Sequence, residues 1–358
     1  QQTPTTPGTD PEPDYGDRDP LDDDDDGTTG TRPTRNPPPP PAPTPQPPAP
    51  GADPTGALDG TVCIIDPSNI VSGGRVEVQH AGGVAYAVTD GNGYFYLDGL
   101  FPGQATVTLR TGSFSTVLDV TIYDGMDSHL AYDSCIPQGD VEIMVVGGEY
   151  DDIGAILSTD GFTYDYIDGT LPGVASNFLL NSAQMAQYDI IFFNCGFRDE
   201  WMSSQAAVTA NLRNYVAAGG SVYASDWAYY LVEASFPSQN TFVGNDAVAG
   251  DAKVGQEQII NASVIDAGMR QLVGPTATID MALEDWAALQ STTSTVLVQG
   301  TFTAYNPQGW NYPDLTITAP LATEFTYSQG KVVYTAFHNE GQNTFDMDAL
   351  LKKIVLSL

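Results

Sequence analysis

The chain has 358 residues, of which 41% are hydrophobic, and a formal net charge of −33 at pH 7. This length suggests two or three domains. The 12 Lys and Arg residues stand against 45 Asp and Glu, so nucleic acid is excluded as an expected partner because little basic surface exists to neutralise phosphates. No apolar run reaches the roughly 18 residues that a membrane-spanning helix needs.

Residues 1–57 hold 17 of the 26 prolines and almost no aliphatic side chains. Such a segment cannot bury enough apolar surface to offset its ordering entropy, so we predict a disordered, acidic, Pro-rich linker. The run Asp22 to Asp26 could collect Ca²⁺ weakly, but it lacks the spaced ligands of an EF-hand loop, which favours a solvated spacer. Because the chain begins at Gln1, we expect a processed, exported protein on the outer surface, in the periplasm or outside the cell, with a lipid anchor on the tail as one mode of attachment.

Residues 58–137 consist of short β-rich runs separated by Gly, Asp and Pro turns at intervals of about 8 to 12 residues, which predicts an all-β sandwich. The expected strands are Gly60 to Ile65, Arg75 to Gln79, Ala85 to Thr89, Tyr94 to Leu97, Gln104 to Arg110, Phe114 to Ile122 and His129 to Tyr132. Asp90, Asn92 and Asp98 could suggest a Ca²⁺ loop. Asn-Gly and Asp-Gly pairs are also what hairpins require, and we favour that interpretation.

Two of the three cysteines, Cys63 and Cys135, lie near the two ends of this β-rich segment. In an exported protein such cysteines are expected to form a disulfide. Cys195 would then be a free thiol.

The stretch VTDGNGYFYLDGLFPGQATVTLR, from Val88 to Arg110, resembles the carboxypeptidase regulatory-like family. The likeness rests on a turn of Asp and Gly, an aromatic strand, a Leu-x-Pro-Gly type turn and a Thr-rich strand. The resemblance implies a transthyretin-like sandwich without catalytic residues, which acts as a spacer or adhesive module in exported proteins.

From Asp140 the pattern changes to strands that alternate with helices. Val141 to Gly148 and Tyr188 to Gly196 are apolar runs that end in glycine, as expected for parallel strands buried on both faces. Further elements are expected at Asp151 to Ser158, Phe162 to Ile167, Ser203 to Ala218 and Val222 to Ala224. Leu321 to Tyr327 and Lys331 to Thr335 are expected to form a hairpin. This order predicts a flavodoxin-like, doubly wound parallel sheet over 140–358, with its site at the carboxyl ends of the strands.

This segment resembles the class I glutamine amidotransferase-like fold, on the motif FHNEG (Phe337 to Gly341) and on the strand, turn and helix start of GGSVYASDWAYYL (Gly219 to Leu231). Residues 241–319 look like an insertion. In that family a Gly-x-Cys-x-Gly elbow carries the nucleophile and a later His-x-Glu completes the triad. The resemblance places Asp226 at the elbow, with His338 and Glu340 as the partners, and gives Cys195 and Gly196 the loop that supplies an oxyanion N–H. Cys195 itself remains the alternative nucleophile.

An aspartate at the elbow cannot turn over an amide through the acyl-enzyme route that a thiolate uses. We therefore expect a protein without glutaminase activity and without a required cofactor, which binds an envelope or extracellular protein or glycan, or has a structural role there. Two alternatives stay open. One is an extracellular hydrolase or metal-dependent enzyme that uses Asp226, His338 and Glu340, which are ligand types for Zn²⁺ or Fe²⁺. The other is an adhesion module that responds to Ca²⁺. Trp310, in a turn-rich stretch, is the tryptophan expected to be exposed.

Overall fold

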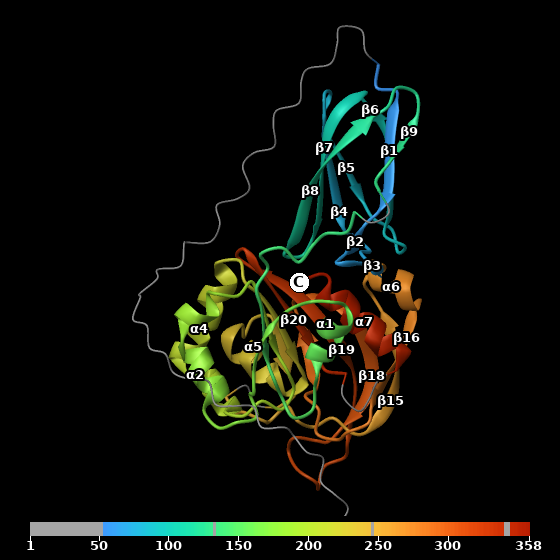
Figure 1. The fold of residues 1–358 in the computed structure, drawn as a ribbon. Helices are drawn as coiled ribbons and strands as arrows, with labels where there is room; N and C mark the ends of the chain where they lie inside the picture. The colour runs from blue at the N-terminus through green and yellow to red at the C-terminus, as the bar shows by residue number, and fades with distance from the viewer. Residues whose placement is uncertain (1–52, 132–133, 245–246, 340–343) are drawn as a thin grey trace, which may run out of the picture. The chain divides into compact units, whose positions relative to one another are not determined.

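The computed structural model of the protein describes residues 53–131, 134–244, 247–339 and 344–358, all within one compact unit (Figure 1). Nearly all of the predicted linker, with its run of aspartates, lies outside the described residues, as does Glu340. None of the described helices combines the length and the apolar character that crossing a membrane would take.

The first part of the described chain is a pair of β-sheets, drawn in blue to green in Figure 1. A four-stranded sheet has the order β5-β4-β7-β8 and a three-stranded sheet has the order β6-β1-β9. Successive side chains along the strands point to opposite faces of each sheet, and one face is buried. In β7, Val107 and Leu109 lie on the buried face. The strands are β1 (Gly56–Thr61), β4 (Arg75–His80), β5 (Gly83–Val88), β6 (Tyr94–Leu100), β7 (Gly103–Thr111), β8 (Phe114–Ile122) and β9 (Asp127–His129).

The start of this sandwich differs from the prediction. The single strand expected at residues 60–65 is two strands, β1 and β2 (Cys63–Ile64), because the Val62 N–H donates to the Gly93 carbonyl and β2 turns back to pair with β3 (Asp66–Ile70). The turn at Asp90 is as predicted. Its carboxylate accepts the N–H groups of Asn92 and Tyr94 at 2.8 and 2.9 Å, so it caps a hairpin turn.

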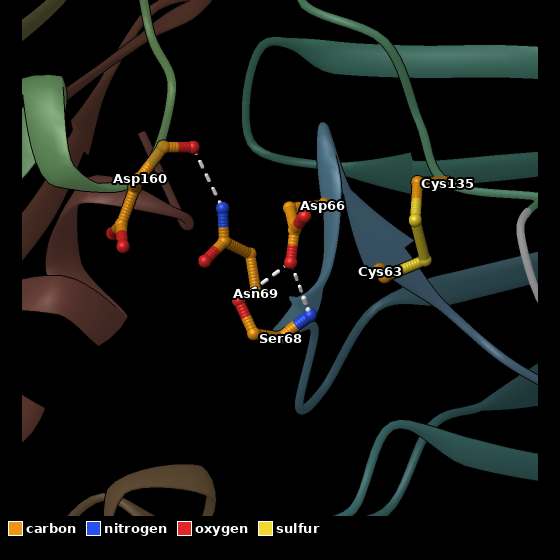
Figure 2. Close-up of a disulfide and its surroundings, with 6 residues drawn as sticks. All are labelled: Cys63, Asp66, Ser68, Asn69, Cys135 and Asp160. Carbon is orange, nitrogen blue, oxygen red and sulfur yellow. Dashed lines mark hydrogen bonds between the residues drawn. A yellow bond between two sulfur atoms is a disulfide. The ribbon is translucent and has the colours of Figure 1, made fainter.

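The predicted disulfide between Cys63 and Cys135 is confirmed, with Cα atoms 4.5 Å apart (Figure 2). The strand that carries Cys63 is also held by backbone hydrogen bonds to Ile136, so covalent and non-covalent links join the same two segments. Figure 2 also shows Asn69, whose side-chain amide donates to the Asp160 carbonyl at 2.8 Å. Lys352 completes this contact by donating to the side chains of both residues.

The second part contains a nine-stranded sheet of order β11-β10-β12-β13-β20-β19-β18-β15-β16. The strands from β11 to β20 in this order are parallel to one another. In chain order they run second, first, third, fourth, fifth, which is the doubly wound order of flavodoxin-like proteins. The parallel strands are β10 (Ile143–Val146), β11 (Asp165–Ile167), β12 (Ile190–Phe193), β13 (Ser221–Ser225) and β20 (Gly330–Thr335).

The continuous apolar runs behave as predicted, since every residue of β10, β12 and β13 is buried. Helices α2, α3 and α4 pack against one another, and α6 packs against α7; Figure 1 shows α2 beside α4. The helices are α1 (Ile153–Thr159), α2 (Val174–Leu180), α3 (Ser182–Met185), α4 (Ala206–Ala217), α5 (Tyr229–Ser235), α6 (Ala267–Val273) and α7 (Phe345–Val355), with 3₁₀ turns η1 (Glu200–Ser204) and η2 (Asp226–Ala228).

The predicted parallel strands form one part of a larger, mixed sheet, and the expected hairpin of β19 and β20 is present. β20 turns back as a hairpin onto β19, and residues 241–319 contribute strands that extend the sheet in antiparallel fashion. The segment read as an insertion is therefore part of the central sheet. These strands are β15 (Gln258–Val264), β16 (Thr276–Met281), β18 (Thr295–Ala304) and β19 (Leu315–Tyr327), while β14 (Asn240–Phe242) pairs with β17 (Leu289–Thr292).

Candidate functional site

Four titratable side chains follow the carboxyl ends of four parallel strands. Asp151 comes after β10, Cys195 after β12, Asp226 after β13 and His338 after β20. Because these strands are neighbours in the sheet, their ends bring the four residues to one edge. This is the edge at which a doubly wound sheet binds its ligands.

Asp226 is the first residue of η2 and lies at the sharp turn that directly follows β13. Its φ of +42° lies in the left-handed region, which for a residue other than glycine stores roughly 1–3 kcal/mol of strain. A strained residue between a strand and a helix is the geometry of a nucleophile elbow. The Ala287 N–H donates to Asp226 Oδ1 at 2.6 Å, so the carboxylate is held from the segment between β16 and β17.

The second carboxylate oxygen of Asp226 faces both Cys195 and His338. The Cys195 thiol donates to Asp226 Oδ2 at 3.3 Å, and His338 Nε2 lies 3.6 Å from the same oxygen. The three residues are 1%, 3% and 2% exposed. The structure therefore brings together two of the three residues predicted for the site, Asp226 and His338, and Cys195 takes the place beside them. The third, Glu340, lies outside the described residues.

The loop predicted to supply an oxyanion N–H is engaged within the protein. The Cys195 N–H donates to Ser225 Oγ at 2.9 Å. Gly196 has a φ of +86°, and a side chain there would meet the Glu149 N atom at 2.9 Å, so glycine is required at this close approach. The Cys195 N–H is thus a structural donor in this state rather than an open one.

A second ring of buried polar groups supports the cluster. Ser225 Oγ donates to Asp151 Oδ2, and the Asn339 N–H donates to Asp151 Oδ1 at 3.2 Å. The Asn194 side chain donates to the Asp151 carbonyl at 2.9 Å. Asp151 therefore links the loops after β10, β12, β13 and β20.

Burial sets the protonation of two members of this site. Burial raises the pKa of the Cys195 thiol well above its usual range, and the nearby Asp226 charge raises it further. A hydrogen bond from the Trp227 backbone N–H lowers the pKa in part. Burial also raises the pKa of Asp151, against the attraction of His338 and the hydrogen bonds from Ser225 and Asn339. The cysteine is accordingly held as a neutral thiol.

The raised pKa of Asp151 predicts a pH dependence of stability. A carboxyl whose pKa is higher in the folded state binds its proton more tightly there, so its contribution is present below the unfolded pKa of about 3.9 and is lost as pH rises through the folded pKa. We expect Asp151→Asn to remove this loss. The difference in unfolding free energy between variant and wild type should rise with pH from about pH 4, by at most about 1.4 kcal/mol per pH unit.

Urea unfolding of metal-free protein at a series of pH values measures this difference. Asp98→Asn, at an exposed position, is the matched control for loss of one negative charge. A flat difference across the series for Asp151→Asn would contradict the assignment.

Sequence reasoning missed Asp151, Ser225 and Ala287. A signal for Asp151 exists, because it follows the glycine pair after β10, at the same sheet edge as the other candidates. Ser225 is the last residue of a strand and carries no distinguishing pattern. Ala287 is distant in sequence from Asp226 and donates through its backbone, so no residue type marks it.

The aromatic side chain of Trp227 lies next to Asp226 in the chain and is held by two contacts. The Trp227 ring has Lys253 Nζ 3.6 Å from its centroid, and its indole N–H donates to the Asp285 carbonyl at 2.7 Å. Lys253 also pairs with Glu200 at 2.6 Å. Trp310 is 93% exposed, as predicted, and is not part of this cluster of side chains. Trp201, which was not expected to be exposed, is 61% exposed.

Among the described residues, one group of His, Cys, Asp and Glu side chains places its ligand atoms within 4.8 Å of one another: Cys195, Asp226 and His338. Thiolate, carboxylate and imidazole are ligand types that zinc accepts. Asp226 and His338 in this group belong to the trio named as an alternative metal set, while Glu340 lies outside the described residues.

Solved structures similar to this chain include PurLQS from Thermotoga maritima, at 10% identity and a TM-score of 0.38, with 60% of this chain and 98% of that chain covered. A ThuA-like protein from Bacteroides uniformis matches at 11% identity and a TM-score of 0.37, over 61% of this chain and 89% of that one. A minor pilin from Streptococcus agalactiae matches at 18% identity and a TM-score of 0.20, over 24% and 45%. No protein-family model and no curated protein matches the chain. At these distances the likenesses carry no argument, and the α/β assignment rests on the strand order.

Proposed function

We propose that this is an exported or surface-tethered protein with a binding or structural role, whose α/β part keeps an amidotransferase-like framework without its nucleophile. The observation that carries the proposal is the residue at the elbow. Asp226 stands where the strand turns into the helix, with one carboxylate oxygen held by Ala287 and the other facing Cys195 and His338.

Cys195 does not replace the missing nucleophile in this proposal. A catalytic cysteine acts as its thiolate, which needs a positive neighbour, a helix N-terminus or a metal to lower its pKa. Cys195 has a carboxylate at 3.3 Å and is almost fully buried, and both raise its pKa. Its sulfur is also turned toward Asp226, so a substrate carbonyl would compete with an existing hydrogen bond.

Export is supported by the disulfide. Disulfides persist in oxidising compartments, where they stabilise small β-domains. The Cys63–Cys135 bond lies in the β-sandwich, which we assign as the carboxypeptidase regulatory-like module on the resemblance of residues 88–110. The Pro-rich tail would then be the tether.

Exposed apolar side chains on the sandwich support a binding role. Strand β5 lies at one end of its sheet, and Val84, Tyr86 and Val88 on it are 44%, 54% and 69% exposed. An end strand with exposed rings and aliphatic groups fits partners that bind through edges and apolar contacts. A protein or glycan of the cell envelope or extracellular space is the proposed partner class.

A glutaminase assay tests the catalytic half of the proposal. Purified protein is incubated with glutamine, and ammonia is measured against buffer and against Cys195→Ala. We expect equal, background release from wild type and variant, because neither contains an activated thiolate. Release by the wild type that disappears in Cys195→Ala would overturn the proposal.

A hydrolase is the second candidate, and the Asp226–His338 contact favours it. A carboxylate 3.6 Å from an imidazole nitrogen can orient that ring for acid–base work. The same preparations can be assayed on ester, peptide and glycan substrates, with His338→Gln as the matched variant. Turnover that His338→Gln abolishes would establish the enzyme and displace the binding role.

A further inference from the structure

We propose that Cys195, Asp226 and His338 form a binding site for a divalent transition metal, with Zn²⁺ as the expected ion. The residues come from three loops at the carboxyl edge of the sheet and are each at least nine-tenths buried. The inference does not depend on the proposed function, since a bound ion could support either a structural or a catalytic role.

The distances between the donor atoms suit a tetrahedral ion. Zinc bonds of about 2.0 Å to oxygen and nitrogen and about 2.3 Å to sulfur give donor separations of about 3.3 to 3.5 Å at the tetrahedral angle. Asp226 Oδ2 lies 3.3 Å from Cys195 Sγ and 3.6 Å from His338 Nε2. These two separations lie within about 0.3 Å of the tetrahedral values, and the third, between the ligand atoms of Cys195 and His338, is at most 4.8 Å.

The surrounding hydrogen bonds orient these donors. Asp226 Oδ1 is occupied by the Ala287 N–H at 2.6 Å, which leaves Oδ2 as a single ligand atom. The Cys195 backbone is fixed by Ser225, and Ser225 in turn by Asp151. Asn339, next to His338, donates its backbone N–H to Asp151. Its side-chain amide accepts the Asp152 N–H and donates to the Asp152 carbonyl. Partners of this kind hold metal ligands in place and are a regular feature of metal sites.

The local charge also favours a cation. Asp151 and Asp226 are both 3% exposed, and the only described histidine beside them is His338. Buried carboxylates need a compensating positive charge or a proton. A divalent ion would supply that charge.

The binding step balances without a redox partner. The S–H bond of Cys195 breaks, a metal–sulfur bond forms, and the proton passes to the buffer. Carboxylate and imidazole bind through lone pairs that they already hold. A water molecule would complete the four ligands of the ion.

The donor atoms of this site favour zinc over calcium. Thiolate and imidazole favour borderline and soft ions, whereas Ca²⁺ takes six to eight oxygen ligands. The many acidic residues of the chain would bind hard cations weakly, so the test is made in excess Ca²⁺ to occupy them.

The full chain is stripped with a chelator, exchanged into excess Ca²⁺ and titrated with Zn²⁺ against a chromophoric competitor. We expect one Zn²⁺ per chain and at least tenfold weaker binding in Cys195→Ser and in His338→Gln. His129→Gln is the control, because His129 contacts Asp59 in the sandwich instead. Failure of the wild type to bind one equivalent, or equal binding by wild type and both site variants, would overturn the site.

Cobalt gives a spectroscopic readout of the ligands that can be taken on the wild-type protein itself. Co²⁺ in the wild-type protein should show the intense sulfur-to-cobalt charge-transfer absorption of a thiolate ligand. The band should be absent in folded Cys195→Ser, with folding checked by circular dichroism. Stoichiometric Co²⁺ binding by the wild type without this band would exclude Cys195 as a ligand and overturn the proposal.

Discussion

Removing the disulfide with Cys63→Ala and Cys135→Ala together is expected to lower the free energy of unfolding of the sandwich by about 4 kcal/mol. The two cysteines are 72 residues apart in sequence, and opening a loop of this length restores chain entropy of that size to the unfolded state. The folded contacts change little, since backbone hydrogen bonds still join Cys63 and Ile65 to Ile136. The main change is therefore in the unfolded chain.

Guanidinium unfolding followed by circular dichroism measures this effect. The denaturant slope should also increase, because an unfolded chain without the cross-link exposes more surface. Ser115→Ala, at an exposed position of β8, is the control for a substitution that leaves the disulfide intact. A loss of less than about 1 kcal/mol in the double variant would contradict the expectation. Equal unfolding free energies of the wild type under reducing and oxidising conditions would contradict it as well.

The sequence predicted the parallel part of the fold because that part has local signals. Apolar runs that end in glycine marked β10 and β12, and a helical pattern followed by Gly219 and Gly220 marked α4 and β13. The disulfide followed from the positions of two cysteines around one β-rich segment. Each of these inferences needed only neighbouring residues.

Apart from the expected hairpin of β19 and β20, the antiparallel strands of the sheet had no such signal. Strands β15, β16 and β18 alternate as strands do, yet which strands they pair with depends on contacts distant in sequence. A pattern of side chains says which residues face inward but not which strand lies alongside. This is why residues 241–319 looked like an insertion and proved to extend the central sheet.

The candidate site was predicted in part for the same reason. Asp226 and His338 could be placed because strand ends of a doubly wound sheet share an edge. The role of Cys195 could not, because the direction of its sulfur depends on Ser225 and Asp226, which lie about 30 residues further along the chain. The sequence suggested an oxyanion loop, whereas the structure uses its N–H internally and turns the thiol to the elbow.

Alkylation of Cys195 in the folded protein should be at least a thousandfold slower than in urea. Cys195 is the one free cysteine, and its side chain is 1% exposed beside a carboxylate. Reaction then requires a local opening of the site, which is several kcal/mol higher in free energy than the native state. An opening free energy of about 4 kcal/mol corresponds to a thousandfold lower rate. Burial and Asp226 also disfavour the reactive thiolate.

The most direct test of the account is therefore the rate of iodoacetamide labelling at pH 8, in chelator and without reductant, followed by mass spectrometry. Ser115→Cys supplies an exposed thiol on β8 as the reference, and Cys195→Ala shows the background. We expect the reference thiol to be labelled quickly while Cys195 stays unmodified until the protein unfolds. Labelling of Cys195 in the folded protein within tenfold of the rate of the reference thiol would show an accessible nucleophile and contradict the account.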